Sequence, residues 1–248
     1  MDKYLKAADL IQKSKKTIVL TGAGISTESG ISDFRSPNTG LWTKLDPMEA
    51  LSTNVLFNDP KKFYNTGFKI ITSMKDAKPN KAHGILAKME DEGLIHLIIT
   101  QNIDNLHLRA GSQNIYEVHG NSRSCTCMKC NKSYNIDTIE ERVNQNEIPP
   151  KCICGGIIRP DVVLFGDMLP DCFYEGMMEV ENADLLIVIG SSLTVYPVSQ
   201  MAAMCKRLII INYSSTPYDY KSNVVLNDNI SDSLTKIYNI LRAKYGTV

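Results

Sequence analysis

The chain has 248 residues, of which 43% are hydrophobic, so it can bury a substantial core in one large domain or in one domain with a small insert. Its 27 Lys and Arg residues balance 27 Asp and Glu residues, at a formal net charge of zero. This balance argues against a broad basic surface, so we expect no direct binding of nucleic acid or anionic lipid.

The first 17 residues mix charged and apolar residues at helical spacing and lack the features of a secretory signal. No apolar run approaches the roughly 20 residues that span a bilayer. We therefore expect a soluble, cytoplasmic protein that does not associate with membranes. A monomer is a separate expectation, which these features do not determine.

Short apolar runs alternate with helical patterns along most of the chain. The expected strands are 17–20, 97–100, 115–118, 185–190, 208–212 and 224–226, and the expected helices are 2–13, 59–74, 81–92, 197–205 and 231–244. Apolar strands between helices predict an α/β fold, with a Rossmann-like parallel sheet and helices on both faces.

The first motif, T-G-A-G-I-S-T-E-S-G-I-S-D-F-R, directly follows the first expected strand. Gly22 and Gly24 permit a tight turn and a close approach of the backbone to a pyrophosphate. Thr27 stands where a dehydrogenase fingerprint has its third glycine, and the acidic residue expected about 20 positions later is absent. Phe34 could cover a planar group and Arg35 could meet a phosphate. An ordinary strand-to-helix turn and a solvated loop are the alternatives.

Polar side chains gather where the second expected strand ends. Gln101, Asn102 and Asp104 follow the strand at 97–100, at the edge where open α/β sheets bind ligands. A capped helix start is the alternative for Asn102 and Asp104, and it accounts for one polar residue better than for three.

His119 ends the third expected strand and is followed by Gly120. An imidazole that titrates near neutral pH is a natural general base. The three remaining histidines lie within expected helices or beside strands, where a structural role is the simpler interpretation: His83, His96 and His107.

Between about residues 120 and 161 the pattern changes to cysteines, polar residues and a short expected helix at 137–144. Cys127 and Cys130 form a C-x-x-C pair, and Cys152 and Cys154 follow at a spacing that suits a four-thiolate zinc site. Four sulfur ligands leave no position for water, so this zinc would be structural. A redox C-x-x-C would not need the second pair. The expected division is 1–120 with 161–248, and an inserted zinc module at 121–160.

The later strand ends are polar as well. Gly190, Ser191 and Ser192 offer N–H and hydroxyl groups to a ribose or phosphate after the fourth strand, and Asn212 ends the fifth. Ordinary strand-to-loop chemistry is the alternative for both.

Six motifs, in order and over nearly the full chain, resemble the sirtuin family in its bacterial or archaeal form. They are the glycine motif, T-Q-N-I-D, V-H-G-N, the paired cysteines, R-P-D-V-V-L-F-G-D and G-S-S-L-T-V-Y-P. The resemblance implies a Rossmann-like domain with a small zinc ribbon, and NAD and an acetyl-lysine protein or peptide as partners. It also implies an NAD-dependent deacetylase that releases nicotinamide and O-acyl-ADP-ribose.

The resemblance assigns roles to individual residues. Asn102 and Asp104 would hold the carboxamide while nicotinamide leaves, and His119 would be the base. Val163 and Phe165, in a strand expected to rejoin the large sheet, would hold the substrate. The further NAD contacts would be Ala23, Thr27, Phe34, Arg35, Gln101, Ile103, Ser191, Ser192, Asn212, Asn229 and Ile230, of which Asn229 fits the family least well.

Two departures from the family pattern carry expectations of their own. The second cysteine pair is C-x-C instead of C-x-x-C, which leaves Cys125 as an alternative ligand. Sirtuins that prefer succinyl-lysine carry a tyrosine and, three residues later, an arginine that meets the acyl carboxylate. Here Tyr64 is followed by Gly67, and Lys69 should point away from the tyrosine face, so neutral acyl groups are expected.

Two other classes of protein remain open at this stage. A zinc-ribbon interaction or nucleic-acid module would have a basic face and no NAD binding. An NAD dehydrogenase would carry the missing third glycine and acidic residue and would produce NADH. ADP-ribosyl transfer to protein stays open as a side activity of the same site.

Overall fold

The computed structural model describes residues 2–33 and 46–246. Within these ranges six parallel strands form one sheet in the order β3-β2-β1-β7-β8-β9. The strands are β1 Thr17–Thr21, β2 Leu97–Thr100, β3 Ile115–Glu117, β7 Leu185–Ile189, β8 Leu208–Ile211 and β9 Val224–Leu226. All six strands expected from the sequence are confirmed to within one residue at their ends. The strand order reverses between β1 and β7, which is where open α/β sheets bind ligands.

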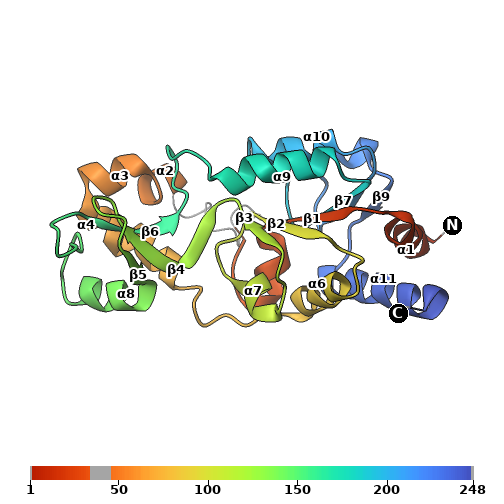
Figure 1. The fold of residues 1–248 in the computed structure, drawn as a ribbon, viewed down its shortest axis with the longest axis horizontal. Helices are drawn as coiled ribbons and strands as arrows, with labels where there is room; N and C mark the ends of the chain where they lie inside the picture. The colour runs from red at the N-terminus through yellow and green to blue at the C-terminus, as the bar shows by residue number, and fades with distance from the viewer. Residues whose placement is uncertain (1, 34–45, 247–248) are drawn as a thin grey trace.

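Helices cover both faces of this sheet, as Figure 1 shows. One face packs against α1 Lys3–Lys13, α6 Lys81–Asp91 and α11 Ile230–Tyr245, and the other against α9 Asp171–Glu181 and α10 Met201–Met204. The sequence did not predict α9, whose central glycine weakens the helical pattern. A Cβ atom at Gly176 would lie 3.2 Å from Ile99 Cδ1, so the glycine lets α9 pack closely on the sheet.

A second, antiparallel sheet of order β5-β4-β6 forms the small end of the molecule. Its strands are β4 Gly120–Cys127, β5 Ser133–Asn135 and β6 Ile158–Val162, and α8 Ile136–Asn144 packs on it. The expectation that the chain rejoins the large sheet at 162–165 is therefore wrong. Val162 pairs with Gly120, so the chain returns along the strand by which it left.

Helices from the first third of the chain complete this small end. They are α2 Pro47–Ala50, α3 Thr53–Asn58, α4 Pro60–Lys62, the π-helical η3 Phe63–Gly67 and α5 Phe68–Thr72, with α4 to α5 taking the place of the expected helix 59–74. Phe63 and Phe68 share one core with Ile139 and Ile158, and Figure 1 shows α3 and α4 beside β5 and β6. The division at 121–160 stays a prediction, and this packing favours adding α3 to α5 to the small unit.

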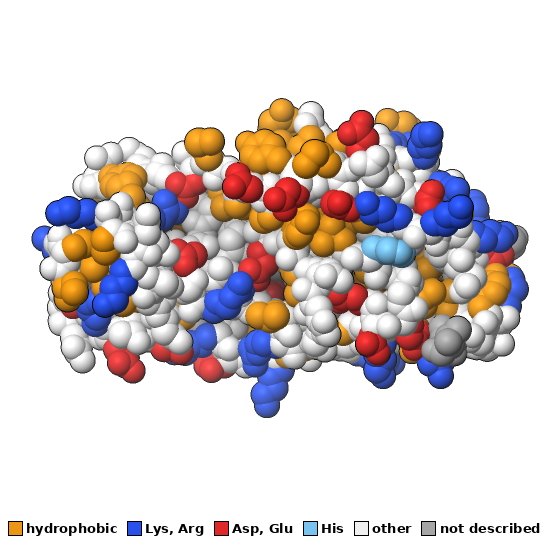
Figure 2. Space-filling view, viewed as in Figure 1, with side chains coloured by type: hydrophobic (Ala, Val, Ile, Leu, Met, Phe, Trp, Pro, Cys, Tyr) orange, Lys and Arg blue, Asp and Glu red, His pale blue; other side chains and the backbone are white. Residues whose placement is uncertain are grey.

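The remaining helical segments are short: η1 Ala23–Ser29, α7 Leu106–Ala110, η4 Val198–Gln200 and η5 Asp219–Lys221. Figure 2 shows hydrophobic side chains gathered above the sheet, in the region of α9, whose Tyr174 and Met178 are 52% and 57% exposed. Basic and acidic side chains are interspersed on the same face. None of the helices in the described part of the chain is both long and apolar enough to cross a membrane.

Candidate active site

Three glycines bring the ends of β1 and β7 into contact at the point where the strand order reverses. The N–H of Gly22 donates to the Ile189 carbonyl at 3.0 Å, and that of Gly24 donates to the Gly190 carbonyl at 2.8 Å. Gly190 has φ +62°, and a Cβ atom there would lie 2.3 Å from Ile25 N. The glycine loop lies where the sequence placed it, but these glycines serve the approach of one strand-end loop to the other.

Asn102 and Asp104 are brought together by a residue that the sequence reasoning missed, Ser26. The Ser26 hydroxyl donates to Asp104 Oδ2 at 2.6 Å and accepts from Asn102 Nδ2 at 3.2 Å. Asn102 Nδ2 also donates to the Gly22 carbonyl at 3.1 Å, and all three side chains are buried. The signal that could have identified Ser26 is a hydroxyl side chain two residues after the second glycine of the motif.

The Asp104 carboxyl is fixed on both oxygens. Oδ1 accepts from the Leu106 N–H at 2.9 Å, which starts α7, while Oδ2 is held by Ser26. Burial raises the pKa of Asp104, and the bonds from Ser26 and Leu106 act in the opposite direction. The bond from the Leu106 N–H supports the capped helix start as an interpretation of Asp104, and the functional role of this residue stays a prediction.

His119 lies half-buried where β3 ends and β4 begins. Its Nδ1 lies 3.0 Å from the Gln101 carbonyl oxygen, which can only accept, so Nδ1 donates and Nε2 is the basic nitrogen of the neutral ring. Gly120 has φ +77°, and a Cβ there would lie 2.1 Å from the Asp161 carbonyl oxygen. The glycine after His119 is thus required for β4 to pair with β6.

The segments around β7 and β8 place further predicted residues at the same edge of the sheet. Gln101 Nε2 donates to Ser191 Oγ at 3.0 Å, which links the ends of β2 and β7. Ser192 Oγ lies 2.8 Å from Thr194 Oγ1, and Asn212 is buried at the end of β8. Gln101 and Ser191 are therefore close in space, and the other two line the adjoining strand ends.

The remaining predicted cofactor residues have local contacts. Thr27 Oγ1 donates to the Gly24 carbonyl at 3.0 Å, and Asn229 caps α11 by accepting from the Asp232 N–H at 2.9 Å. Ile230 is 8% exposed and packs in the core. The roles of these residues in NAD binding stay predictions. Ala23 begins η1 and Ile103 lies between Asn102 and Asp104, whereas Phe34 and Arg35 lie outside the described residues.

Val163 and Phe165 follow β6, and Val163 lies next to His119. The Val163 N–H donates to the His119 carbonyl at 2.9 Å. Phe165 donates its N–H to the Leu51 carbonyl at 2.9 Å and accepts from the Thr53 N–H at 3.0 Å, and its side chain is 42% exposed. These two residues therefore lie outside the large sheet, on the segment that joins the small sheet to α9.

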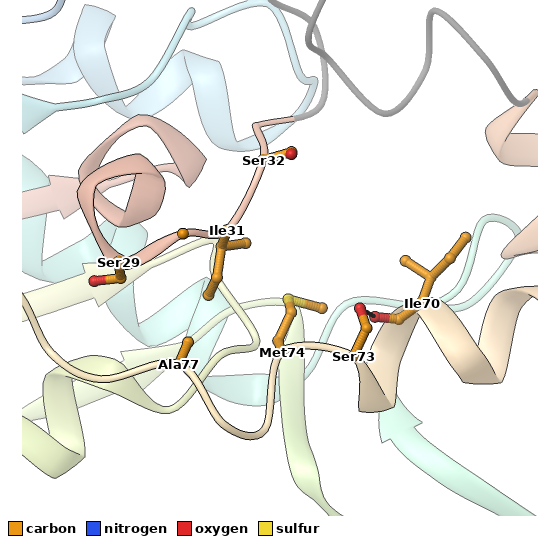
Figure 3. A pocket seen from close by; sticks show the side chains of 8 residues that line it. Ser29, Ile31, Ser32, Ile70, Ser73, Met74 and Ala77 are labelled. Carbon is orange, nitrogen blue, oxygen red and sulfur yellow. Dashed lines mark hydrogen bonds between the residues drawn. The ribbon is translucent and has the colours of Figure 1, made fainter.

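A pocket of about 290 Å³ opens between the segment after η1 and the end of α5. In Figure 3 Ser29, Ile31 and Ser32 lie on one side, and Ile70, Ser73 and Met74 on the other. The described residues that line it are serine, glycine, alanine, isoleucine and methionine, so none is charged.

The four predicted metal ligands converge at one point. The Sγ atoms of Cys127, Cys130, Cys152 and Cys154 all lie within 4.8 Å of one another. The Cys127–Cys154 pair is 3.5 Å apart and the Cys130–Cys152 pair is 3.6 Å apart. Tetrahedral bonds of about 2.3 Å to zinc place two sulfurs about 3.8 Å apart, so the tetrad fits a structural zinc ion. Bonds from the Cys154 N–H and the Tyr134 hydroxyl lower the pKa of Cys152 to about 6.

Cys125 is not part of this tetrad. Its side chain is fully buried in the core of the small unit, where burial raises the pKa of the thiol. The cysteines that come together are therefore the four that the sequence assigned, and Cys125, which was left open as an alternative ligand, lies outside the group. The C-x-C pair reaches the metal position because Gly155 turns the chain with φ +82° and the Cys152 N–H bonds to the Gly156 carbonyl at 2.8 Å.

The fold and the site together define an α/β protein with a dinucleotide-type sheet, a buried Asn–Ser–Asp cluster, an adjacent histidine and a thiolate tetrad. Residues 22–197 match the Sir2 family. The chain is 57% identical to NAD-dependent protein deacetylase 2 of Caldanaerobacter subterraneus subsp. tengcongensis, with 97% of this chain and 96% of that protein covered. It is 44% identical to an NAD-dependent protein deacetylase of Saccharolobus solfataricus, with 97% and 98% covered.

Solved structures give the same result. A Sir2 complex with a deacetylated p53 peptide and 3'-O-acetyl ADP ribose matches with a TM-score of 0.89 and 36% identity, covering 98% of both chains. A Sir2 complex with a p53 peptide and NAD+ matches with a TM-score of 0.85 and 36% identity, covering 94% of this chain and 96% of that one. The chain belongs to the Sir2 family, as its motifs indicated.

Proposed function

We propose that this protein removes acetyl groups from protein lysines in an NAD-dependent reaction and releases nicotinamide and O-acyl-ADP-ribose. The observation that carries the proposal is the buried Asn102–Ser26–Asp104 cluster next to a histidine with a fixed tautomer. The names of the relatives, which are NAD-dependent protein deacetylases, support the same activity.

In this reaction NAD supplies an activated ribose as the acyl acceptor. Asn102 and Asp104 would orient the carboxamide so that nicotinamide leaves as the acyl oxygen approaches the ribose. Their mutual bonds through Ser26 hold them in place before NAD binds, which avoids reorganisation during the reaction. His119 Nε2 would then accept the proton of a ribose hydroxyl.

The other binding roles are proposed in the same way. Val163 and Phe165 would hold the acetyl-lysine peptide, and the thiolate tetrad would hold one zinc that takes no part in the chemistry. The residues proposed to contact NAD are Gly22, Ala23, Gly24, Thr27, Phe34, Arg35, Gln101, Ile103, Gly190, Ser191, Ser192, Asn212, Asn229 and Ile230. We further propose that the protein is cytoplasmic and monomeric, and size-exclusion chromatography with light scattering tests the second point.

An acetyl-lysine peptide assay tests the proposed function directly. The protein is incubated with the peptide with and without NAD, and mass spectrometry follows the loss of the acetyl group. We expect deacetylation only with NAD, together with free nicotinamide and no NADH absorbance. Deacetylation without NAD, or none with it, would contradict the proposal, and NADH would indicate a dehydrogenase instead.

We predict that acetyl peptides are used at least about 10-fold better than succinyl peptides, because a buried carboxylate without a cationic partner is strongly disfavoured. A Cβ atom at Gly67 would lie 2.1 Å from the Ala50 carbonyl oxygen, so an arginine cannot enter there without moving α2.

The measurement is kcat/KM on matched acetyl and succinyl peptides, with a propionyl peptide as the neutral control. A Sir2 structure with a propionylated peptide is among the similar structures. The Tyr64 hydroxyl does not serve as a donor to an acyl carboxylate, since the side chain is fully buried and its hydroxyl donates to the Ile158 carbonyl at 2.5 Å. Equal or better turnover of the succinyl peptide would contradict the prediction.

Substitution of Ser26 by alanine should lower kcat about 10-fold to 100-fold and reduce the free energy of unfolding by about 1–3 kcal/mol, because it leaves Asp104 and Asn102 buried with lost partners. Ser29→Ala is the matched control, since the Ser29 hydroxyl on the same helix has no hydrogen-bond partner among the described residues. Steady-state deacetylation and urea unfolding measure both effects. Equal activities of the two variants would show that the Ser26 hydroxyl does not contribute to the reaction.

A further inference from the structure

Two histidines that the proposed chemistry does not use lie buried behind the site. His83 of α6 is fully buried, His107 of α7 is 2% exposed, and their ring centroids are 4.9 Å apart in an edge contact. Burial lowers the pKa of His83 to about 4 and that of His107 to about 3, so both rings are neutral at neutral pH.

A directional chain of hydrogen bonds leads from His107 to the backbone of Asn102. The Thr21 hydroxyl donates to Thr100 Oγ1 at 2.8 Å, so at its 3.0 Å contact with His107 it accepts from Nε2–H. Thr100 Oγ1 also accepts from the Asn102 N–H at 3.1 Å. His107 therefore fixes the hydroxyls at the ends of β1 and β2, and through them the start of the loop that carries Asn102 and Asp104.

His83 leads to the other side of the same cluster. Asn80 Oδ1 accepts from the Ala82 N–H at 2.9 Å, and Asn80 Nδ2 donates to the Ile25 carbonyl at 2.7 Å, so the orientation of this amide is determined. The His83 Nδ1 atom lies 3.0 Å from Asn80 Oδ1 and 3.4 Å from the Asn80 backbone nitrogen, and it cannot donate to the first and accept from the second at once. Because the amide oxygen can only accept and its contact is the shorter one, we assign the proton to Nδ1, which then donates to Asn80 Oδ1. Ile25 directly precedes Ser26, which bonds to Asn102 and Asp104.

The arrangement has an energetic cost that packing alone does not explain. His83 Nε2 and His107 Nδ1 are buried and have no hydrogen-bond partner in the described part of the chain. A buried acceptor without a donor costs about 1–3 kcal/mol in a typical protein, and apolar side chains of similar size would avoid that cost. The bonds made by the other nitrogen of each ring are the compensating gain. One chain of bonds ends at the Asn102 N–H, and the other ends at the Ile25 carbonyl, one residue before Ser26.

We propose that His83 and His107 are positioning residues, which hold the β1 and β2 loops so that Asn102 and Asp104 meet the nicotinamide carboxamide. This inference rests on the proposed deacetylase function. It requires that nicotinamide cleavage, the step served by Asn102 and Asp104, depends on the hydrogen bond that each imidazole donates and not on the volume of the ring.

Matched substitutions separate the hydrogen bond from the volume. The side-chain amide of glutamine can place a donor near the position of Nε2, and that of asparagine near the position of Nδ1. We expect His107→Leu and His83→Leu to lower kcat about 100-fold with little change in the KM for the peptide. His107→Gln and His83→Asn should restore kcat to within about 5-fold of the wild type.

The rate at which labelled nicotinamide exchanges into NAD distinguishes the two roles, because a purely structural role of the histidines would not change this rate selectively. In the leucine variants exchange should fall by the same factor as deacetylation, while NAD binding by calorimetry and the melting temperature stay close to the wild type. The control is His96→Leu, since His96 is exposed and bonds to the Thr17 N–H at the opposite end of the strands. Its activity should equal that of the wild type.

If His107→Leu does not fold, Thr21→Val interrupts the same series of hydrogen bonds and leaves both histidines in place. Thr21→Ser restores the hydroxyl. Wild-type kcat in His107→Leu or in Thr21→Val would overturn the proposal, as would equal losses in the glutamine and leucine variants. These results differ from a failure of the proposed function, in which the wild-type protein itself would not deacetylate the peptide.

Discussion

Replacement of His119 by alanine should nearly abolish deacetylation, with a loss of about 10²–10⁴-fold in kcat, because a general base typically contributes a factor of this size. NAD binding should persist, since the side-chain amides of Gln101 and Asn102 are held by bonds to Ser191 and Gly22 that do not involve the imidazole. Exchange of nicotinamide should also persist, because His119 would act only after nicotinamide has left. Steady-state kinetics, calorimetry with NAD and the exchange assay measure the three effects.

The bond between His119 and Gln101 supplies the control for this experiment. His119→Asn can keep a donor to the Gln101 carbonyl but has no basic nitrogen, so we expect it to be as inactive as His119→Ala. Recovery of activity in His119→Asn would show that the imidazole only holds the Gln101 loop. The contrast with the leucine variants of His83 and His107 is then direct, because those should lose the exchange reaction that the His119 variants keep.

The large sheet was predictable because its strands are buried on both faces. A strand such as Leu185–Ile189, in which every residue is buried, appears in the sequence as a continuous apolar run between polar ends. The small sheet has no such signal. The burial pattern of β4 is irregular across a shift in register, and β6 is only five residues long and contains Pro160, so the antiparallel return of the chain could not be predicted from periodicity.

The sequence indicated the polar residues of the site, but not the contacts between them. Asn102 and Asp104 stand together in the chain, whereas Ser26 reaches them only because β1 and β2 are neighbours in the sheet. The same is true of His107, which bonds to a residue 86 positions away and was interpreted as merely structural. For Asn229 the structure shows a helix cap, which the sequence reasoning did not consider, and its contact with NAD stays a prediction.

Removal of any one cysteine of the tetrad should eliminate the bound zinc and inactivate the enzyme. We expect one zinc per chain in the wild type, and almost none in Cys127→Ala, Cys130→Ala, Cys152→Ala and Cys154→Ala, as measured by elemental mass spectrometry. Cys125→Ala is the matched control: it removes a neighbouring thiol that lies outside the tetrad, so it should keep its zinc. Loss of zinc from Cys125→Ala, with retention in Cys152→Ala, would contradict the assignment.

The loss of activity should be indirect, because four thiolates leave no coordination position for a substrate. Structural zinc sites contribute on the order of 10–16 kcal/mol to folding in zinc-finger peptides, so the small sheet should unfold without the metal. Cys127 and Cys152 share a core with Ile158, and β6 leads directly to Val163, whose N–H is bonded to the His119 carbonyl. Chelation of the zinc should therefore abolish deacetylation and reduce the circular dichroism signal by the contribution of the small unit, while NAD binding to the large sheet is retained. Added zinc should restore both the activity and the circular dichroism signal. If the enzyme without zinc stays folded but is inactive, the result would indicate that the metal takes part in the reaction.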